Sequence, residues 1–486
     1  MDLIVLSNRL PFAISRGEDG GWKVEPGSGG LVTALRPVLQ NRGGCWIGWP
    51  GVASEDLPDA APVLSGRNYG YELVPVPLTK ADETDFYYGF SNEIVWPLFH
   101  DLLGFCNFEP RYWAAYERVN RKYGETAAER AGEDDFVWVH DYHLMNVARV
   151  LRGQRTRARL GFFLHIPFPS PDMFMKLPWR LEVLRAISDY DLVGFQTNRD
   201  RRNFLQCVRL LMSDATISAK GTLVGTPSRD VRVGTFPISI DFSDFEKRGR
   251  KPGVIEKSRN LRTDESDRCL VLGVDRLDYT KGIPHKLEAF RELLRKYPDW
   301  AGKVTLVQIV VPSREDIPRY REQKTEIESL VGEINGQFTR SGWVPIHYIY
   351  RSLEGPRLAA YYLAADVALV TPLKDGMNLV AKEYCATRSS DSGVLVLSEF
   401  AGAAEQLHGG ALMVNPFDVQ GVAAALDRAL RMEAGEQRRR MRRMRKTVRE
   451  HDIFAWLDSY LRAAVSRDLK DFEQTGEVVP EEVFAE

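Results

Sequence analysis

The sequence has little of what identifies a secreted, membrane-spanning or zinc-binding protein. Cysteine is scarce, and the five cysteines are widely spaced: Cys45, Cys106, Cys207, Cys269 and Cys385. An odd number at such spacing argues against a disulfide framework and against paired zinc ligands. Long apolar runs are also missing, because even stretches such as VTLVQIVV fall well short of the ~20 residues that span a bilayer. A reducing cytoplasm therefore suits the chain best.

An excess of one charge is absent too. The chain carries 65 basic and 67 acidic residues, so no field of the whole molecule favours nucleic acid or a membrane surface. Any bound anion must be held by local groups. The N-terminal MDLIVLSNR has neither the basic region nor the apolar length of a signal peptide. What is plentiful is length, since 486 residues with 44% apolar side chains predict two or more globular domains.

Short β-branched apolar runs recur, separated by longer helical patterns. They occupy residues 3–7, 45–49, 72–76, 136–140, 160–165, 192–196 and 231–238 in the first half, and 269–275, 304–311, 346–350, 367–371, 393–398 and 411–415 in the second. Each run is nearly continuous in apolar character, as expected of strands buried on both faces of a parallel sheet. The sequence therefore predicts two doubly wound α/β domains, with a ligand cleft at the carboxyl ends of their strands.

The first candidate site segment is KDGMNLVAKEY, residues 374–384, which follows a strand-like run. A short turn and a helix are expected here, and a helix start offers unpaired amides that suit a phosphate. Those amides would come from Asn378, Leu379 and Val380. Glu383 shares a helix face with Leu379 and can reach a ligand group one turn deeper, such as a ribose diol. The alternative is that Asp375 only caps the helix and that Glu383 is exposed.

The second candidate segment is GVDRLDYTKGIPHKL, residues 273–287, again directly after a strand-like run. Arg276 and Lys281 lie five residues apart in a loop before a helix. Both can converge on a diphosphate, the arginine as a bidentate fork and the lysine as a point charge. The alternative is that Arg276 only pairs with Asp275 or Asp278 at the surface.

Three weaker segments also place polar residues at strand ends or glycine turns. WVHDYHLM and FLHIPFPS contain Asp141, His143 and His165, whose spacing does not support a metal site. GSGGLVTAL (27–35) is a glycine turn that enters a helix. It lacks the Lys-Ser/Thr of a P-loop and the spacing of a dinucleotide fingerprint. No metal is therefore predicted.

Two regions are expected to be structural. The polar, Gly-rich AISRGEDGGWKVEP near the N-terminus is expected to form a mobile loop over the cleft. Residues 417–470 are helical in pattern, with Asp418 as a helix cap. The arginine-rich stretch 438–446 resembles a nucleic-acid patch. Met441 and Met444 lie on one helix face, however, so the arginines are expected to form its solvated side.

Taken in order, these segments resemble the retaining trehalose-6-phosphate synthases, GT-B glycosyltransferases of family 20. The resemblance covers nearly the whole chain and is carried by SNRLP, SGGLVTAL, WIGWPG, YYGFSNEIVWPLFH, WVHDYHLM, FLHIPFPS, DLVGFQT, FPISID, GVDRLDYTKGIP, VQIVVPSRED, INGQF, DGMNLVAKEY and LSEFAGAA. It implies two facing Rossmann-like domains with a deep cleft. The first, 1–245, would bind the acceptor and the second, 246–452, the nucleotide sugar. A helix in 453–486 would cross back to the first.

The resemblance also implies a reaction. Glucose would pass from UDP- or GDP-glucose to glucose 6-phosphate with retention, by front-face substitution and without a cofactor or metal. The chain departs from the family pattern at Tyr88-Gly89 and in PWRLEV, both near the acceptor side. A glucosylglycerol-phosphate synthase or related pseudo-glycosyltransferase, and a catalytically silent regulatory homologue, are the alternatives. The donor nucleotide, a homo-oligomeric state and allosteric control stay open.

Individual roles follow from the resemblance as well. The residues implied to bind the donor are Gly30, His165, Arg276, Lys281, Asp375, Gly376, Met377, Asn378, Leu379, Val380 and Glu383. Those implied to bind the acceptor are Arg9, Trp46, Tyr87, Trp96, Asp141 and Arg314. Within these sets, the residues expected to take part in catalysis are Asp141, His165, Arg276, Lys281 and Asp375.

Overall fold

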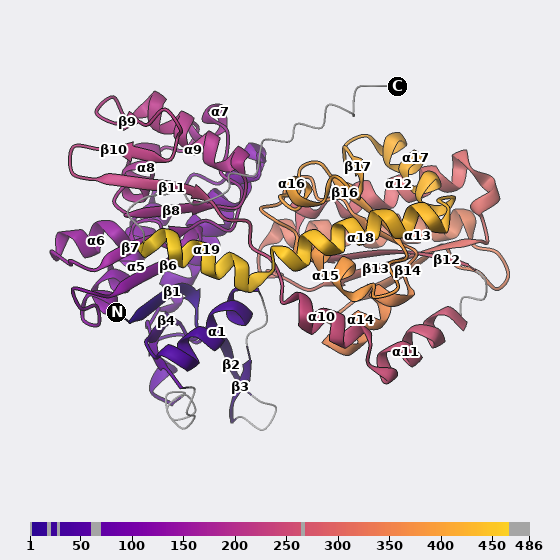
Figure 1. Ribbon diagram of the computed structural model, residues 1–486, viewed down its shortest axis with the longest axis horizontal. Helices are drawn as coiled ribbons and strands as arrows, with labels where there is room; N and C mark the ends of the chain where they lie inside the picture. The colour runs from indigo at the N-terminus through magenta and orange to yellow at the C-terminus, as the bar shows by residue number, and fades with distance from the viewer. Residues whose placement is uncertain (1, 17–20, 27–29, 60–69, 264–267, 466–486) are drawn as a thin grey trace. The chain divides into compact units, whose positions relative to one another are not determined.

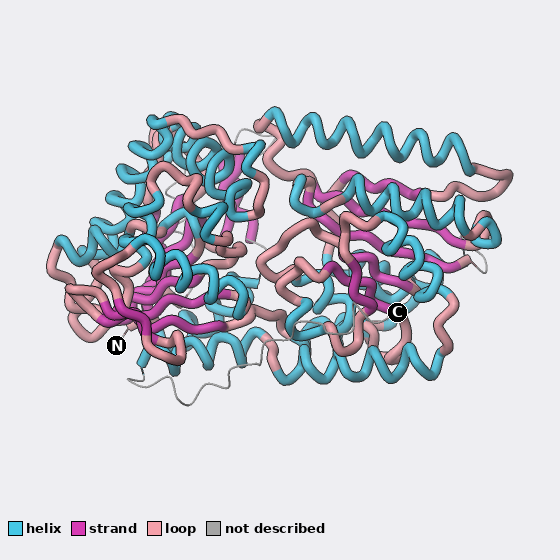
Figure 2. The backbone as a smooth tube through the Cα atoms, turned by 90° about the horizontal axis from the view of Figure 1, so that it is seen from above, coloured by secondary structure: helices cyan, strands magenta, loops and turns pink. Residues whose placement is uncertain are grey.

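The computed structural model describes residues 2–16, 21–26, 30–59, 70–263 and 268–465. The chain divides into two compact units: the first runs to Ile238 and resumes at Phe454, and the second is Ser239–Ile453. In each unit the strands lie between layers of helices (Figures 1 and 2). This is the α/β architecture that the sequence predicts.

The first unit is built on a sheet that, within the described residues, has nine strands in the order β5-β4-β1-β6-β7-β8-β11-β10-β9. They are β1 (Leu3–Arg9), β4 (Cys45–Trp49), β5 (Glu72–Pro75), β6 (Phe136–His140), β7 (Arg159–Phe163), β8 (Leu192–Phe195), β9 (Thr216–Ile217), β10 (Leu223–Gly225) and β11 (Asp230–Thr235). All neighbours pair in parallel except β9 and β10 at one edge. Every residue of β4, β6 and β8 is buried, which explains their continuous apolar sequences.

Helices cover this sheet. They are α1 (Gly30–Arg42), α3 (Lys80–Asp82), a π-helix (Glu83–Val95), α4 (Trp96–Phe99), α5 (Pro110–Ala128), α6 (Val147–Gly153), α7 (Pro171–Phe174), α8 (Arg180–Ile187) and α9 (Asn198–Leu211). Thr79 and Asp82 form a capping box at the start of α3. The buried Asp82 carboxylate also accepts hydrogen bonds from Arg118 and Lys122 of α5. These bonds anchor the start of the π-helix to α5.

The segment near the N-terminus that the sequence assigns to a mobile loop differs from that expectation. Its described residues form β2 (Phe12–Arg16) and β3 (Trp22–Pro26), which pair as antiparallel strands. Phe12 and Ile14, two residues apart, are each 5% exposed. A period of two buries one side of a strand, and the many glycines and charges around it concealed this alternation.

The second unit contains a parallel sheet whose described strands follow the order β14-β13-β12-β15-β16-β17. They are β12 (Cys269–Arg276), β13 (Val304–Val311), β14 (Ile346–Tyr350), β15 (Val367–Val370), β16 (Val394–Ser398) and β17 (Leu412–Val414). Numbered along the chain, this is the order 3-2-1-4-5-6 of a Rossmann sheet. Each strand predicted from an apolar run is confirmed in both units.

The helices of the second unit are α10 (Phe242–Gly249), α11 (Pro252–Thr263), α12 (Ile283–Lys296), α13 (Pro318–Phe338), α14 (Gly355–Ala364), α15 (Leu379–Thr387), α16 (Ala404–Leu407), α17 (Val419–Leu430) and α18 (Ala434–Glu450). The predicted cap is confirmed, because Asp418 Oδ1 accepts a hydrogen bond from the Gly421 amide at 2.9 Å. Met441 and Met444 are buried as predicted. The expectation for the arginines is wrong at Arg445, which is 5% exposed.

The last described helix, α19 (Ile453–Val465), belongs almost entirely to the first unit, where it lies beside β6 and β7 (Figure 1). Trp138 stacks on Tyr460, with ring centroids 4.3 Å apart, and the Tyr460 hydroxyl donates to the Phe162 carbonyl. Gly161 and Gly194 permit this approach, because a Cβ on either would lie within 3 Å of Tyr460. None of the described helices is long and apolar enough to cross a membrane.

Candidate functional site

Several of the predicted site residues lie at or after strand ends where the strand order of a sheet reverses. In the second unit this point lies between β12 and β15, which are hydrogen-bonded neighbours. β12 ends at Arg276, and Asp375 comes five residues after β15. In the first unit the reversal lies between β1, which ends at Arg9, and β6, which is followed by Asp141. Doubly wound sheets bind their ligands at these positions.

A buried carboxylate, Asp278, organises the cations of the second unit. Arg276 Nη2 and Arg314 Nη1 each lie 3.9 Å from Asp278 Oδ2. Burial raises the pKa of this carboxyl, but the charges of the two arginines and of Lys281 outweigh burial, so its pKa lies below the ordinary value. Asp278 is therefore ionised. Arg314, which is predicted for the acceptor phosphate, therefore lies beside Arg276, which is predicted for the donor diphosphate.

The two loops of this unit meet through Lys281 and Asp375. Lys281 Nζ lies 2.7 Å from Asp375 Oδ2, although 94 residues separate them. Asn378 Nδ2 donates to the same oxygen at 3.2 Å. Asp375 thus bonds to a neighbouring loop and to Asn378, while the cap position of α15 belongs to Asn378 itself. The structure brings the first and second candidate segments together.

The loop that contains Gly376 and Met377 is held by the segment that follows β16. The Gly402 amide donates to the Asp375 carbonyl at 3.0 Å, and the Ala403 amide donates to the Met377 carbonyl at 2.7 Å. A Cβ on Gly402 would lie 1.9 Å from the Gly376 carbonyl oxygen. Only glycine therefore fits at position 402, and the loop before α15 is fixed in place.

Helix α15 begins at Leu379, and its first-turn amides include those of Leu379 and Val380. Asn378 precedes them with a φ of 70°, a left-handed conformation that asparagine tolerates better than most residues. One turn deeper, Glu383 Oε2 accepts a hydrogen bond from the Tyr362 hydroxyl at 2.7 Å. Burial raises the pKa of Glu383, opposed by this hydrogen bond and by the charge of Arg248. Tyr362 thus fixes the carboxylate predicted to hold a ribose.

In the first unit, Arg9 lies against two aromatic rings. Its guanidinium carbon is 4.5 Å from the centre of the Trp49 ring and 5.7 Å from that of Tyr87. Tyr87 also stacks on His143, with centroids 5.9 Å apart and planes at 11°. Aromatic faces attract a guanidinium without satisfying its hydrogen bonds. Arg9 and Tyr87, both predicted for the acceptor phosphate, are thus brought together.

The two tryptophans that are predicted to bind the acceptor, Trp46 and Trp96, are both buried. Trp46 is 1% exposed, and its indole N–H donates to the Ser7 hydroxyl at 2.7 Å inside the sheet. The residue that lies opposite Arg9 in the β1–β4 pairing is Trp49, so Trp49 and not Trp46 contacts Arg9. Trp96 is 5% exposed and lies 5.8 Å from the Tyr142 ring. The roles given to Trp46 and Trp96 stay predictions.

Asp141 and His165 meet where β6 and β7 end. Asp141 has a φ of 75°, and its carboxylate accepts a hydrogen bond from the His165 amide at 3.2 Å. His165 Nε2 lies 3.2 Å from His140 Nδ1, so one of these two nitrogens is a donor and the other an acceptor. Burial lowers the pKa of His165 to about 3, and burial together with His165 lowers that of His140. Both imidazoles are therefore neutral at physiological pH.

This pair of histidines gives the stability a specific pH dependence. An unfolded histidine protonates below about pH 6.5, whereas folded His165 does so only near pH 3. Between these values the unfolded chain binds the extra proton, so stability falls as the pH falls. From pH 7.5 to 5.0 we expect His165 to remove about 2 kcal/mol of unfolding free energy, measured by urea denaturation. H165Q should flatten the slope, and H451Q, at an exposed histidine, should not; equal slopes in both would contradict the assignment.

The remaining predictions concern Gly30 and metals. Gly30 is the first residue of α1, and residues 27–29 before it lie outside the described part. Among the described residues, no three His, Cys, Asp or Glu side chains gather in a way that could hold a metal ion.

Sequence reasoning missed several residues of these groups. The sequence suggests Asp278 only as a surface partner of Arg276, yet it is 2% exposed; its place between two cations in one loop is a usable signal. Trp49 could have been found from its position at the end of a strand. Tyr362 leaves no signal, because it lies in another helix. His140 is the last residue of β6, directly before Asp141, so its place at a strand end is a usable signal.

The chain matches the family model for glycosyltransferase family 20 over residues 1–466. The trehalose-6-phosphate synthase of Mycolicibacterium gilvum (strain PYR-GCK) is 43% identical over 480 residues, which cover 96% of this chain and 94% of that protein. The trehalose-6-phosphate synthase of Mycobacterium leprae (strain TN) is 43% identical over 482 residues, with 97% and 96% covered.

Solved structures of similar proteins match this chain over nearly its whole length. An α,α-trehalose-phosphate synthase (UDP-forming) from Burkholderia xenovorans, in complex with glucose-6-phosphate, is 34% identical and has a TM-score of 0.86, covering 96% of this chain and 100% of that one. A structure from E. coli bound with UDP-2-fluoro glucose is 35% identical with a TM-score of 0.86, covering 96% and 99%.

Proposed function

We propose, since the chain belongs to glycosyltransferase family 20, that it is an α,α-trehalose-phosphate synthase. It transfers glucose from a nucleotide sugar to glucose 6-phosphate and forms α,α-trehalose 6-phosphate with retention at the anomeric carbon. The names of the relatives and the ligands in the solved structures support this reading. Within the chain, the observation that carries it is the pairing of Lys281 with Asp375 before the start of α15, with Arg276 beside Asp278 in the same loop as Lys281.

The donor diphosphate is assigned to the second unit. Arg276 and Lys281 supply two positive charges, and the first-turn amides of α15 supply donors at the positive end of a helix dipole. These groups stabilise the negative charge that develops on the leaving phosphate as the glycosidic bond breaks. Because the surrounding loops hold them in place, little reorganisation is needed during the reaction.

The transferred glucose is assigned to Asp375 and His165, and the ribose to Glu383. Lys281 and Asp375 are already paired, but an ammonium group has three donors and a carboxylate about four acceptor sites. Each can therefore keep the other in position while it also binds substrate. A neutral His165 can exchange hydrogen bonds with a sugar hydroxyl without adding a charge beside a cation-like sugar.

The acceptor phosphate is assigned to Arg9, Tyr87 and Arg314. Arg9 rests on aromatic rings, so its N–H groups can serve a phosphate as a bidentate fork. Arg314 is held by Asp278 and by the Tyr320 hydroxyl, to which it donates at 2.8 Å. The acceptor hydroxyl then attacks on the face from which the diphosphate leaves, and the departing phosphate oxygen takes its proton.

The cosubstrate is a nucleotide-activated glucose, and UDP is the nucleotide supported by a UDP-forming relative and by a solved structure bound with UDP-2-fluoro glucose. We assign no cofactor or metal to the reaction, because the charged groups that it needs are side chains and amides of the chain. A cytoplasmic location is part of the same proposal.

A matrix of donors and acceptors tests the function. The pure protein is incubated with UDP-glucose or GDP-glucose, and with glucose 6-phosphate or glycerol 3-phosphate. Release of nucleoside diphosphate and an α,α-1,1-linked disaccharide phosphate, identified by NMR, is expected with UDP-glucose and glucose 6-phosphate.

The other cells of the matrix discriminate the alternatives. Turnover with glycerol 3-phosphate in place of glucose 6-phosphate would identify a glucosylglycerol-phosphate synthase. No product with either donor would leave only a catalytically silent homologue, and the proposal would be wrong.

A further inference from the structure

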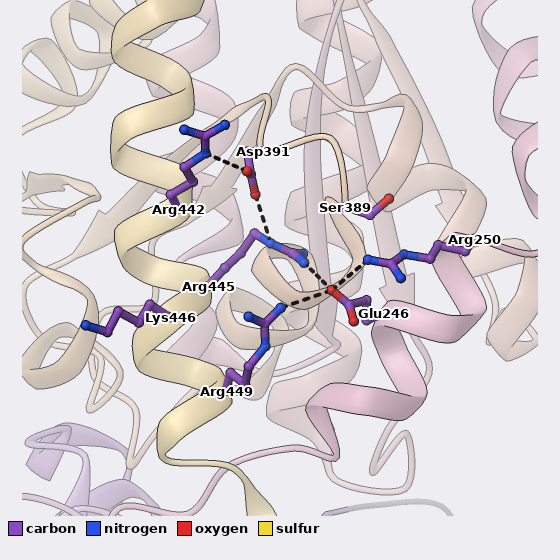
Figure 3. A pocket seen from close by; sticks show the side chains of 8 residues that line it. All are labelled: Glu246, Arg250, Ser389, Asp391, Arg442, Arg445, Lys446 and Arg449. Atoms are coloured by element: carbon purple, nitrogen blue, oxygen red, sulfur yellow. Dashed lines mark hydrogen bonds and ion pairs between the residues drawn. The ribbon is translucent and has the colours of Figure 1, made fainter.

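A second group of cations lies in the second unit, and none of its residues is assigned to the reaction. It surrounds a cavity of about 290 Å³ that is lined by Glu246, Arg250, Ser389, Asp391, Arg442, Arg445, Lys446 and Arg449. Figure 3 shows these side chains, which come from α18, from the region of α10 and from the loop after α15. We call this group the α18 pocket.

Positive charge exceeds negative charge in the α18 pocket. Five cations line it against two carboxylates, and the carboxylates are shared. Glu246 Oε1 lies within 3.2 Å of Arg250, Arg445 and Arg449, and Asp391 pairs with Arg442 and Arg445. Four guanidinium groups carry about twenty N–H donors, whereas two carboxylates offer about eight acceptor sites.

The centre of the pocket is a buried arginine held by several contacts, and not part of a solvated helix face. The Arg445 side chain is only 6% exposed. Its Nη1 donates to the Cys385 and Ala386 carbonyls at 2.9 and 2.7 Å, and its other nitrogens contact Glu246 and Asp391. Burial lowers the pKa of Arg445, opposed chiefly by Glu246 and Asp391. A fixed, desolvated arginine of this kind is a directional hydrogen-bond donor, and the exposed arginines are arranged around it.

We propose that the α18 pocket is a binding site for a small molecule that carries a phosphate group. A phosphate supplies three acceptor oxygens and close to two negative charges, which match the surplus of N–H donors and of positive charge. Ser389 also lines the cavity, and its side chain is a neutral donor. The volume accommodates inorganic phosphate or a phosphorylated metabolite, and the proposal does not depend on the transferase assignment.

The pocket also touches an element that the reaction uses. The two carbonyls that Arg445 holds belong to the last turn of α15, where a cation is favourable. The first turn of the same helix carries Leu379 and Val380. A ligand in the α18 pocket therefore bonds to the side chains that fix the end of α15, and the backbone of residues 385–391 should report its binding.

Hydrogen exchange with inorganic phosphate as the probe tests the site. Relative to potassium chloride of equal ionic strength, phosphate is expected to slow amide exchange in peptides that span 385–391 and 434–450. The test variant is R442Q/R449Q, which removes two exposed cations of the pocket and leaves Arg445 in place. The matched control is R438Q/R439Q, with the same charge change at exposed positions of α18 outside the pocket.

The expected result is slowing in the wild type and in R438Q/R439Q, and its loss in R442Q/R449Q with phosphate affinity at this site reduced about tenfold or more. Equal slowing in both double variants would overturn the proposal, as would slowing in the wild type no greater than with chloride. Phosphate that binds the cations of the proposed active site would instead protect peptides near Arg276 and Leu379. The two proposals can therefore fail separately.

Discussion

Arg276→Ala is expected to lower kcat/KM about 10³-fold and to leave the fold unchanged. The guanidinium is assigned to the leaving diphosphate, where loss of one fixed donor costs about 10²–10³ in rate and more when the donor carries a full charge. Its side chain is 49% exposed, so little packing is lost. Steady-state kinetics with varied UDP-glucose, together with urea denaturation, measure both effects.

Arg319→Ala is the matched control for this variant. Arg319 lies in the same unit, its side chain is 51% exposed, and it pairs with the carboxylate of Glu322. Its removal should change neither kcat/KM nor, beyond about 0.5 kcal/mol, the unfolding free energy. Near-native turnover in R276A, or an equal loss in R319A, would show that the diphosphate is held elsewhere.

Lys286→Met is expected to destabilise the second unit by about 3–5 kcal/mol. Lys286 Nζ lies 2.5 Å from Asp275 Oδ2, and the two side chains are 0% and 1% exposed. Without the lysine, the buried carboxylate still accepts a hydrogen bond from the Gln308 amide at 2.9 Å, which does not neutralise its charge. A buried charge that loses its counter-ion keeps the free-energy cost of desolvation, and no ion pair offsets that cost. The midpoint of urea unfolding, with an unchanged denaturant dependence, measures the loss.

Two further variants make this result specific. D275N/K286M removes both charges and keeps a side chain that can accept from Gln308, so it should recover most of the lost stability. Lys296→Met changes the same residue type at an exposed position of α12 and should alter stability by no more than about 0.5 kcal/mol. If K286M lost no more than K296M, the ion pair would contribute little to the fold.

The strands were predictable because a parallel sheet covered on both faces needs continuous apolar runs. Every strand expected from such a run is present in the two sheets. The β2–β3 hairpin was missed for the converse reason, since it buries alternate residues such as Phe12 and Ile14 within a polar, Gly-rich segment. Arg445 was missed because helical spacing shows which face is apolar, but not which long side chain turns inward.

The candidate site was predictable as far as its parts are local. Arg276 and Lys281 share one loop, and Leu379, Val380 and Glu383 share one helix, so their proximity follows from short spacing. The pairing of Lys281 with Asp375 was not predictable, because 94 residues separate them. Neither was the hydrogen bond from Tyr362 to Glu383, which joins α14 to α15.

By itself the sequence determined two α/β domains, the limits of their strands and the segments that follow those strands. Only the tertiary structure decided which segments meet. The apolar runs do not predict the order of the strands in the sheet. The pairing of β12 with β13 and β15 places Arg314 and Asp375 beside the loop after Arg276. The same holds for α19, whose Trp456 and Tyr460 stack on Trp138. A parallel sheet joins strands through long crossovers, so residues far apart in the chain come together at its carboxyl edge.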